Sequence, residues 1–121
     1  MTHKILICDD SVSIRQMLVL TLSDTKYDVT ESKDGMQALE LAKQNVFDLI
    51  ITDVNMPLLD GLSLVTKLRV LPNYRFKPIL LLTTETDPQK KKQAKAAGAT
   101  GWIIKPFDPD KLLVAIRKVL R

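Results

Sequence analysis

With 121 residues, 45% of them hydrophobic and 26% charged, the chain is expected to form one globular domain over residues 1–121. Its single cysteine, Cys8, excludes an internal disulfide, and no cluster of Cys and His exists for structural zinc. The formal net charge of +4 is modest, and no apolar run approaches the roughly 20 residues that span a bilayer, so we expect a cytoplasmic protein without a membrane segment.

Strand-like and helix-like patterns alternate along the whole chain. Runs of apolar and β-branched residues, the pattern typical of strands, occur at 4–8, 28–32, 48–52, 78–83 and 101–105. The third and fourth runs lack polar alternation, as expected for central parallel strands that helices cover on both faces.

An amphipathic segment that fits a helix follows each of these runs. The residues expected to begin the helices are Ser11, Asp34, Asp60, Asp87 and Asp108. Met17 is expected to face the core from the first helix, and Gly98 to end the fourth. Met36 and Met56 are also interpreted as packing residues, and Phe76 as partly buried in a loop. Five such pairs predict a flavodoxin-like (βα)5 fold, a doubly wound five-stranded parallel sheet with strand order 2-1-3-4-5.

A basic run, Lys90 to Lys92 with Lys95, follows Pro88 at helical spacing. Such a run is usually a solvated helix face, and a docking surface for an acidic partner is the sharper interpretation. Nucleic-acid binding is not expected, because the chain shows no second recognition helix and no aromatic residues among the basic ones.

Polar side chains stand at the ends of four predicted strands. Asp9 and Asp10 follow the first strand, and Asp53 follows the third. Thr83 and Lys105 end the fourth and the fifth. Because the functional crevice of an open parallel sheet lies at the carboxyl ends of its strands, we expect these five side chains to meet on one rim.

Three carboxylates on one rim repel one another, by about 4 kcal/mol for each pair at ~4 Å and an effective dielectric constant of about 20. Mg²⁺ prefers oxygen ligands and removes this repulsion, and Lys105 supplies a further positive charge. A carboxylate beside a metal, a lysine and a hydroxyl is the equipment for phosphoryl transfer onto Asp53. The phosphorylated and free states would differ in what Thr83 and Lys105 bind, which makes the site a switch.

These residues lead to a known family. The sequence resembles the receiver domains of two-component response regulators over its whole length. The matching elements are Asp9-Asp10, Asp53 to Gly61, Thr83, Ala97-Gly98-Ala99 and Lys105-Pro106-Phe107. Since the chain stops after its fifth helix, the resemblance implies a single-domain regulator of the chemotaxis, CheY-like type.

The resemblance implies a role for each site residue. Asp53 would accept a phosphoryl group from the phosphohistidine of a sensor kinase, CheA-like in a chemotaxis system. Asp10 would bind Mg²⁺ directly, Asp9 would bind it through water, and the backbone carbonyl of Asn55 would be another ligand. The Lys105–Pro106 peptide bond would be cis. The chain would catalyse only the phosphorylation and dephosphorylation of its own aspartate, so it would not be an enzyme for external substrates.

The resemblance also implies an effector surface formed by the fourth helix, the fifth strand and the fifth helix. Its side chains would be Lys90, Lys91, Lys92, Trp102 and Arg117. In a chemotaxis system the effector would be the flagellar motor switch, and we expect a monomer that reaches it by diffusion.

Two positions depart from the usual pattern of the family. Trp102 stands where Tyr or Phe is general, and Thr84 is bulkier than the Ala or Gly often found there. A larger indole is expected to swing inward less readily when Thr83 moves. Asn55 and Glu85 flank the site and would tune the lifetime of the phosphoryl group.

Several alternatives share this fold or this chemistry. A phosphate sink or an adaptor receiver outside motility fits the same residues, although the presence of all site groups disfavours an adaptor that has lost the switch. A phosphatase similar to haloacid dehalogenases would carry a second Asp two residues after the nucleophile, where this chain has Asn55. A flavin carrier would need a loop rich in Ser, Thr or Gly where this chain has Asp9-Asp10.

Overall fold

The computed structural model describes residues 2–84 and 86–120, and these contain one five-stranded parallel sheet. Its strands are β1 (Lys4–Cys8), β2 (Asp28–Ser32), β3 (Leu49–Asp53), β4 (Ile79–Thr83) and β5 (Gly101–Ile104). They lie in the order β2-β1-β3-β4-β5, which confirms the predicted flavodoxin-like fold. The predicted strand bounds are correct to within one residue, and Asp53 is the last residue of β3 rather than the first after it.

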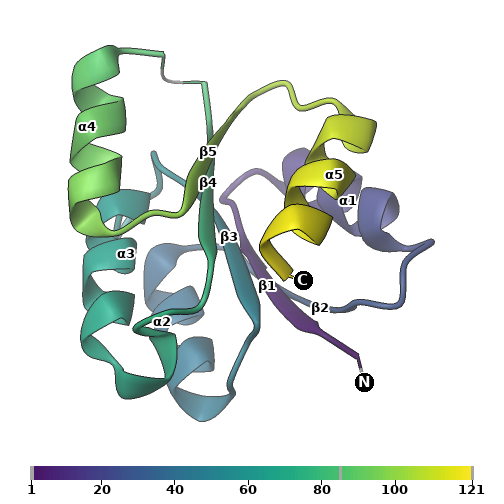
Figure 1. Cartoon of the computed structure of the whole chain (residues 1–121), viewed down its shortest axis with the longest axis horizontal. Helices are drawn as coiled ribbons and strands as arrows, with labels where there is room; N and C mark the ends of the chain where they lie inside the picture. Colours follow the sequence, from purple (N-terminus) through teal and green to yellow (C-terminus); the bar gives the residue numbers. More distant parts are fainter. Residues whose placement is uncertain (1, 85, 121) are drawn as a thin grey trace.

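Helices cover both faces of the sheet (Figure 1). They are α1 (Val12–Leu22), α2 (Gly35–Gln44), α3 (Gly61–Val70), α4 (Pro88–Ala97) and α5 (Pro109–Leu120), with a short 3₁₀ helix, η1, at Pro72–Tyr74. Helices α1 and α5 pack on one face, and α2, α3 and α4 pack on the other. None of the helices within the described residues is long and apolar enough to cross a membrane.

The strands divide their side chains between two cores. Leu6, Ile50 and Leu81 point toward α2, α3 and α4. Ile5 and Ile51 point toward α1 and α5. All residues of β3 and β4 are buried, as expected from the apolar runs 49–51 and 79–82 with which these strands begin. Each fully buried Leu or Ile stabilises the fold by about 2 kcal/mol relative to an exposed one, and this burial sets the register that aligns the strand ends.

Side-chain caps determine where the helices begin. The hydroxyl of Ser11 and the carboxylates of Asp34 and Asp60 accept hydrogen bonds from backbone N–H groups in the first turns of α1, α2 and α3. Asp87 caps α4 in the same way, and Gly98 ends that helix in the left-handed region with φ of 110°. The predicted starts of these four helices are therefore confirmed. Glycine suits position 98 because a Cβ disfavours this backbone conformation.

Two methionines predicted to pack are instead exposed. Met17 in α1 and Met36 in α2 have exposed fractions of 44% and 52%. Successive residues lie about 100° apart around a helix, so Met17 falls outside the buried stripe that contains Leu18. By the same geometry Met36 lies about 200° from the buried Ala38. Met56 packs against the core as predicted.

Arg69 in α3 joins the segments around the carboxyl end of that helix. Its Nε and Nη2 donate to the carbonyl oxygen of Gly98 at 3.0 and 2.8 Å. Its Nη1 donates to the carbonyl oxygens of Tyr74 and Lys77, both at 2.6 Å. The loop held in this way directs Tyr74 into the core and leaves Phe76 92% exposed, so the prediction that Phe76 is partly buried is wrong.

We expect Arg69→Met to lower the free energy of unfolding by about 2–4 kcal/mol, because three backbone carbonyls lose charge-assisted hydrogen bonds. Arg75→Met is the matched control, since Arg75 is exposed and its side chain makes no hydrogen bond within the described residues. Urea unfolding followed by circular dichroism measures both variants. Equal stability of the two would contradict the role assigned to Arg69.

Candidate functional site

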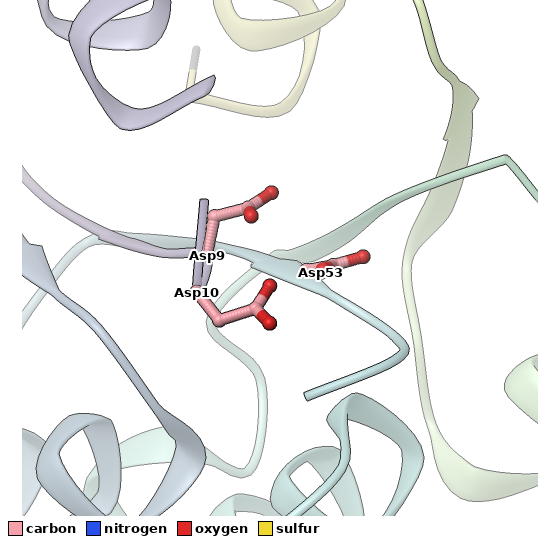
Figure 2. A group of neighbouring side chains, drawn as sticks. All are labelled: Asp9, Asp10 and Asp53. Atoms are coloured by element: carbon pink, nitrogen blue, oxygen red, sulfur yellow. The ribbon is translucent and has the colours of Figure 1, made fainter. Parts of the chain in front are cut away.

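The carboxyl ends of two neighbouring strands bring three carboxylates together. Asp9 and Asp10 follow β1, and Asp53 ends β3. One carboxylate oxygen from each lies within 4.8 Å of the others, and Figure 2 shows the three side chains projecting to the same side. Asp9 and Asp53 are buried, whereas Asp10 is exposed. The fold therefore assembles the acidic cluster predicted from the sequence, with one carboxylate open to solvent.

Lys105 follows β5 and reaches into this cluster. Its Nζ lies 2.7 Å from Oδ2 of Asp9 and 3.2 Å from Oδ1 of Asp53. The Lys105 side chain is only 13% exposed, so water screens these contacts less than it screens a surface ion pair. Burial by itself would lower the pKa of Lys105, but the hydrogen bond with Asp9 and the charges of Asp53 and Asp9 outweigh it and raise that pKa. The amine is therefore a fixed positive charge between two carboxylates.

The charges of the cluster favour a further cation. Burial, and after it the charge of Asp9, raises the pKa of Asp53 above its ordinary value. Lys105 opposes this rise, as does the backbone N–H of Val54, which donates to Oδ1 of Asp53 at 2.8 Å. Three carboxylates thus face one ammonium group. Clustered carboxylate oxygens with excess negative charge are the donor set of a hard divalent cation, so these residues fit Mg²⁺.

Arg15 in α1 contributes to the site, although the sequence did not suggest it. Its Nη1 donates to the carbonyl oxygen of Asp9 at 2.6 Å, and its Nε lies 3.5 Å from Oε1 of Glu31 in β2. The backbone N–H of Ser11 donates to Oδ1 of Asp9 at 2.9 Å. These contacts hold the turn that carries Asp9 and Asp10. A basic residue in the first turn of a helix that directly follows an acidic pair was the signal available in the sequence.

The other predicted site residues lie around this cluster. Thr83 ends β4 with its side chain buried, and its carbonyl oxygen accepts a hydrogen bond from the N–H of Lys105 at 2.8 Å. Asn55 is exposed in the loop after β3. The bond between Lys105 and Pro106 is cis, as the resemblance implied. Glu85 lies outside the described residues.

Trp102 and Thr83 lie on the same face of the sheet. Trp102 pairs with Leu81 across β5 and β4, and Leu81 and Thr83, two residues apart, point to the same side. Trp102 is half-buried, and its Nε1 is shielded from solvent without a hydrogen-bond partner among the described residues. The indole lines a pocket of about 310 Å³ between α4 and β5, together with Lys91 and Lys95. The sequence pointed to Trp102, but only the structure reveals the unpaired N–H.

We expect Asp53→Asn to stabilise the metal-free protein at neutral pH. A raised pKa means that the folded state favours the protonated carboxyl, so the ionised form opposes folding, and this penalty grows as the pH rises through the pKa of Asp53. The variant should therefore have a higher midpoint of thermal unfolding at pH 7 in EDTA. The gain should shrink as the pH falls below that pKa.

Asp24→Asn is the control for this measurement, since Asp24 is exposed and lies outside the cluster. It should leave the midpoint of thermal unfolding nearly unchanged both at pH 7 and at a pH below the pKa of Asp53. A lower midpoint for Asp53→Asn at pH 7 would mean that the ion pair with Lys105 outweighs burial and the charge of Asp9.

Known proteins share both the fold and the sequence pattern. The family model of the response regulator receiver domain matches residues 5–117. The chain is 32% identical over 121 residues to the transcriptional regulatory protein SrrA of Staphylococcus aureus; the match covers 100% of this chain and 49% of SrrA. The chain thus spans about half the length of this curated relative.

Two solved structures illustrate the likeness. Chemotaxis response regulator CheY4 of Vibrio cholerae has a TM-score of 0.94 and 50% sequence identity, covering 99% of this chain and 100% of that chain. The receiver domain of sensor histidine kinase PA1611 from Pseudomonas aeruginosa, whose structure has a magnesium ion coordinated in the active site cleft, has a TM-score of 0.91 and 28% identity, covering 99% and 98%. The family match extends over nearly the whole chain, and the chain therefore belongs to the response regulator receiver domains, the signalling modules of two-component systems.

Proposed function

We propose that this chain is a phospho-acceptor in two-component signalling, with the receiver domain extending over residues 1–121 and Asp53 as the modified residue. The observation that carries the proposal is the environment of Asp53, at the end of the central strand and within reach of Lys105 and two further acids. Within the described residues, the contacts from Val54 and Lys105 both use Oδ1 of Asp53. We therefore assign Oδ2 as the attacking oxygen.

We assign Mg²⁺ to the acidic cluster, held by Asp10, Asp53 and the backbone carbonyl of Asn55, with Asp9 contributing through water. Three carboxylates opposed by one ammonium group support this assignment, as does the magnesium ion in the active site cleft of the PA1611 receiver domain. Bound there, Mg²⁺ would neutralise negative charge on the phosphoryl oxygens during transfer.

The transfer step needs little chemistry from the protein beyond positioning and charge. Oδ2 of Asp53 forms a new O–P bond as the N–P bond of the donor phosphohistidine breaks, and the departing imidazole keeps the electron pair and takes a proton from solvent. Lys105 then exchanges its contact with Oδ1 of Asp53 for a phosphoryl oxygen. The hydroxyl of Thr83 binds another phosphoryl oxygen, and hydrolysis later restores the free aspartate.

This exchange of contacts provides the switch. Thr83 must turn toward the phosphoryl group, and the space it vacates is on the face of the sheet that carries Trp102. Inward movement of Trp102 would give its unpaired Nε1 a new environment and would reshape the pocket between α4 and β5. The surface of α4, β5 and α5 thereby changes its affinity for an effector.

We propose chemotaxis as the setting, with a CheA-like histidine kinase as phosphodonor and the flagellar motor switch as effector. The full-length likeness to CheY4 at 50% identity supports this setting more strongly than the half-length likeness to SrrA supports a transcriptional one. The protein would act as a cytoplasmic monomer. A phosphate sink would use the same site but would need no effector that recognises the phosphorylated form.

With Mg²⁺ present, the protein should gain one base-labile phosphoryl group from acetyl phosphate or a phosphohistidine kinase domain. Asp53→Asn or excess EDTA should reduce incorporation to background, because each removes the nucleophile or the cation. Asp24→Asn is the matched control and should react like the unmodified protein. Intact-mass analysis measures the gain. Modification of Asp53→Asn at another residue, or repeated turnover of external phosphate esters as in a phosphatase, would contradict the proposal.

Lys105→Ala should be phosphorylated more slowly than the unmodified protein. Phosphorylation of this variant should no longer alter the surface of α4, β5 and α5. The measurement is the shift of the backbone amide signals of Lys91 and Trp102 when beryllofluoride and Mg²⁺ are added, compared with Lys111→Ala on the exposed side of α5. We expect these shifts in Lys111→Ala and their loss in Lys105→Ala, because alanine at position 105 has no amine to bind the group at Asp53. Unchanged shifts in Lys105→Ala would remove Lys105 from the switch.

A further inference from the structure

A groove on the outer surface between α2 and α3 takes no part in the proposed switch. It has a volume of about 300 Å³ and is lined by Leu39, Lys43, Lys67, Val70 and Leu71. Leu39 and Lys43 lie in the middle and in the last turn of α2, and the other lining residues lie in the last turn of α3 and directly after it. In βα units these helix ends lie at the amino edge of the sheet, opposite the edge that carries Asp9, Asp10 and Asp53. A partner in this groove would leave the acidic cluster uncovered.

The floor of the groove is apolar and accessible. Val70 is 78% exposed, while Leu39 and Leu71 are half-buried and pack against the core beneath. Further apolar side chains are exposed at the same end of the molecule, Val46 after α2 at 46% and Phe76 after η1 at 92%. Exposed apolar surface that lines a concavity is typical of a site that another molecule covers.

The charge around the groove selects the kind of partner. Lys43 and Lys67 stand on its two sides, and no acidic residue lines it. The ion pairs of the described residues link Arg15 to Glu31, Lys77 to Asp48, and Lys105 to Asp9 and Asp53, so neither groove lysine is neutralised in this way. An acidic partner would be attracted electrostatically by both lysines. A second copy of the chain bound through the same groove about a two-fold axis would instead bring four lysines into one interface, with no acidic lining residue to offset them.

We propose that the groove between α2 and α3 docks an acidic, leucine-bearing helical segment of a partner protein, and does so whether or not Asp53 is phosphorylated. Leucine side chains of the segment would cover Val70 and Leu71, and carboxylates on its flanks would pair with Lys43 and Lys67. Such docking would tether the domain while the surface of α4, β5 and α5 remains open. The proposal goes beyond the phospho-acceptor function and can fail independently of it.

The test uses a synthetic amphipathic peptide with leucines at i, i+3, i+4 and i+7 and glutamates between them, titrated into ¹⁵N-labelled protein. We expect saturable amide shifts confined to the groove residues and their neighbours, with the same Kd for the unmodified protein in the absence and in the presence of beryllofluoride and Mg²⁺. Val70→Ser combined with Lys67→Glu should weaken binding about tenfold or more, which corresponds to about 1.4 kcal/mol. The matching peptide with glutamine in place of glutamate should bind weakly.

The control for the groove variant carries the same substitutions on another helix. Val114→Ser with Lys111→Glu changes an exposed valine and an exposed lysine of α5, and it should leave the Kd unchanged. Circular dichroism of both double variants verifies that each is folded. This pair separates loss of the groove from a general loss of positive charge.

Five outcomes would overturn the proposal. The first three concern the peptide: no saturable shift up to about 1 mM peptide, shifts centred on Lys90 to Lys92 of α4, or equal binding of the glutamine peptide. The fourth is a shift of the groove residues when the protein concentration is raised without peptide. The fifth is binding to phosphatidylglycerol vesicles that depends on Val70 when the peptide does not bind. The fourth would assign the groove to a second copy of the chain, and the fifth would assign it to an anionic membrane surface.

Discussion

The ionic contact of Lys105 with Asp9 and Asp53 is the interaction on which the rest of the site depends. One ammonium group at 2.7 and 3.2 Å from two carboxylates compensates part of their repulsion. Burial, and after it the charge of Asp9, still raises the pKa of Asp53 above its ordinary value. Such a cluster gains stability from each added positive charge. The position of the Lys105 side chain would thus respond to a group bound at Asp53, and this response would be the physical basis of the proposed switch.

The sheet supplies the rigidity that this contact requires. Parallel register aligns the ends of β1 and β3, and the N–H of Gly61 donates to the carbonyl oxygen of Val54 at 2.8 Å, which closes the loop after β3. A Cβ at Gly61 would overlap the carbonyl oxygen of Asp53, so glycine permits this close approach of α3 to β3. Within that loop Leu58 has a φ of 70°, a conformation that is strained for a leucine and is maintained only by the structure around it.

The fold and the acidic cluster could be predicted because uninterrupted apolar runs identify buried parallel strands, and strand ends identify the functional edge. The residues that escaped prediction depend on three-dimensional contacts. Arg15 acts through the backbone of Asp9, and only the packing of α4 beside β5 shows that Nε1 of Trp102 has no hydrogen-bond partner among the described residues. The error at Phe76 has the same origin, because hydrophobicity suggested burial while the hydrogen bonds of Arg69 to the flanking backbone turn that residue outward.

The two ends of α4 are held very differently, and this asymmetry bears on how a change at Thr83 can reach the surface. At the carboxyl end, Arg69 binds the carbonyl oxygen of Gly98 through two nitrogens, and Ala94 is buried against the core. At the amino end, every residue from Pro88 to Gln93 is exposed. The amino half of α4 also follows β4 at the edge of the sheet where Thr83 lies. In the proposed switch, a movement of Thr83 would therefore reach the less anchored half of this helix first. The hydrogen bonds of Arg69 to Gly98 would favour tilting of α4 about its carboxyl end over displacement of the whole helix.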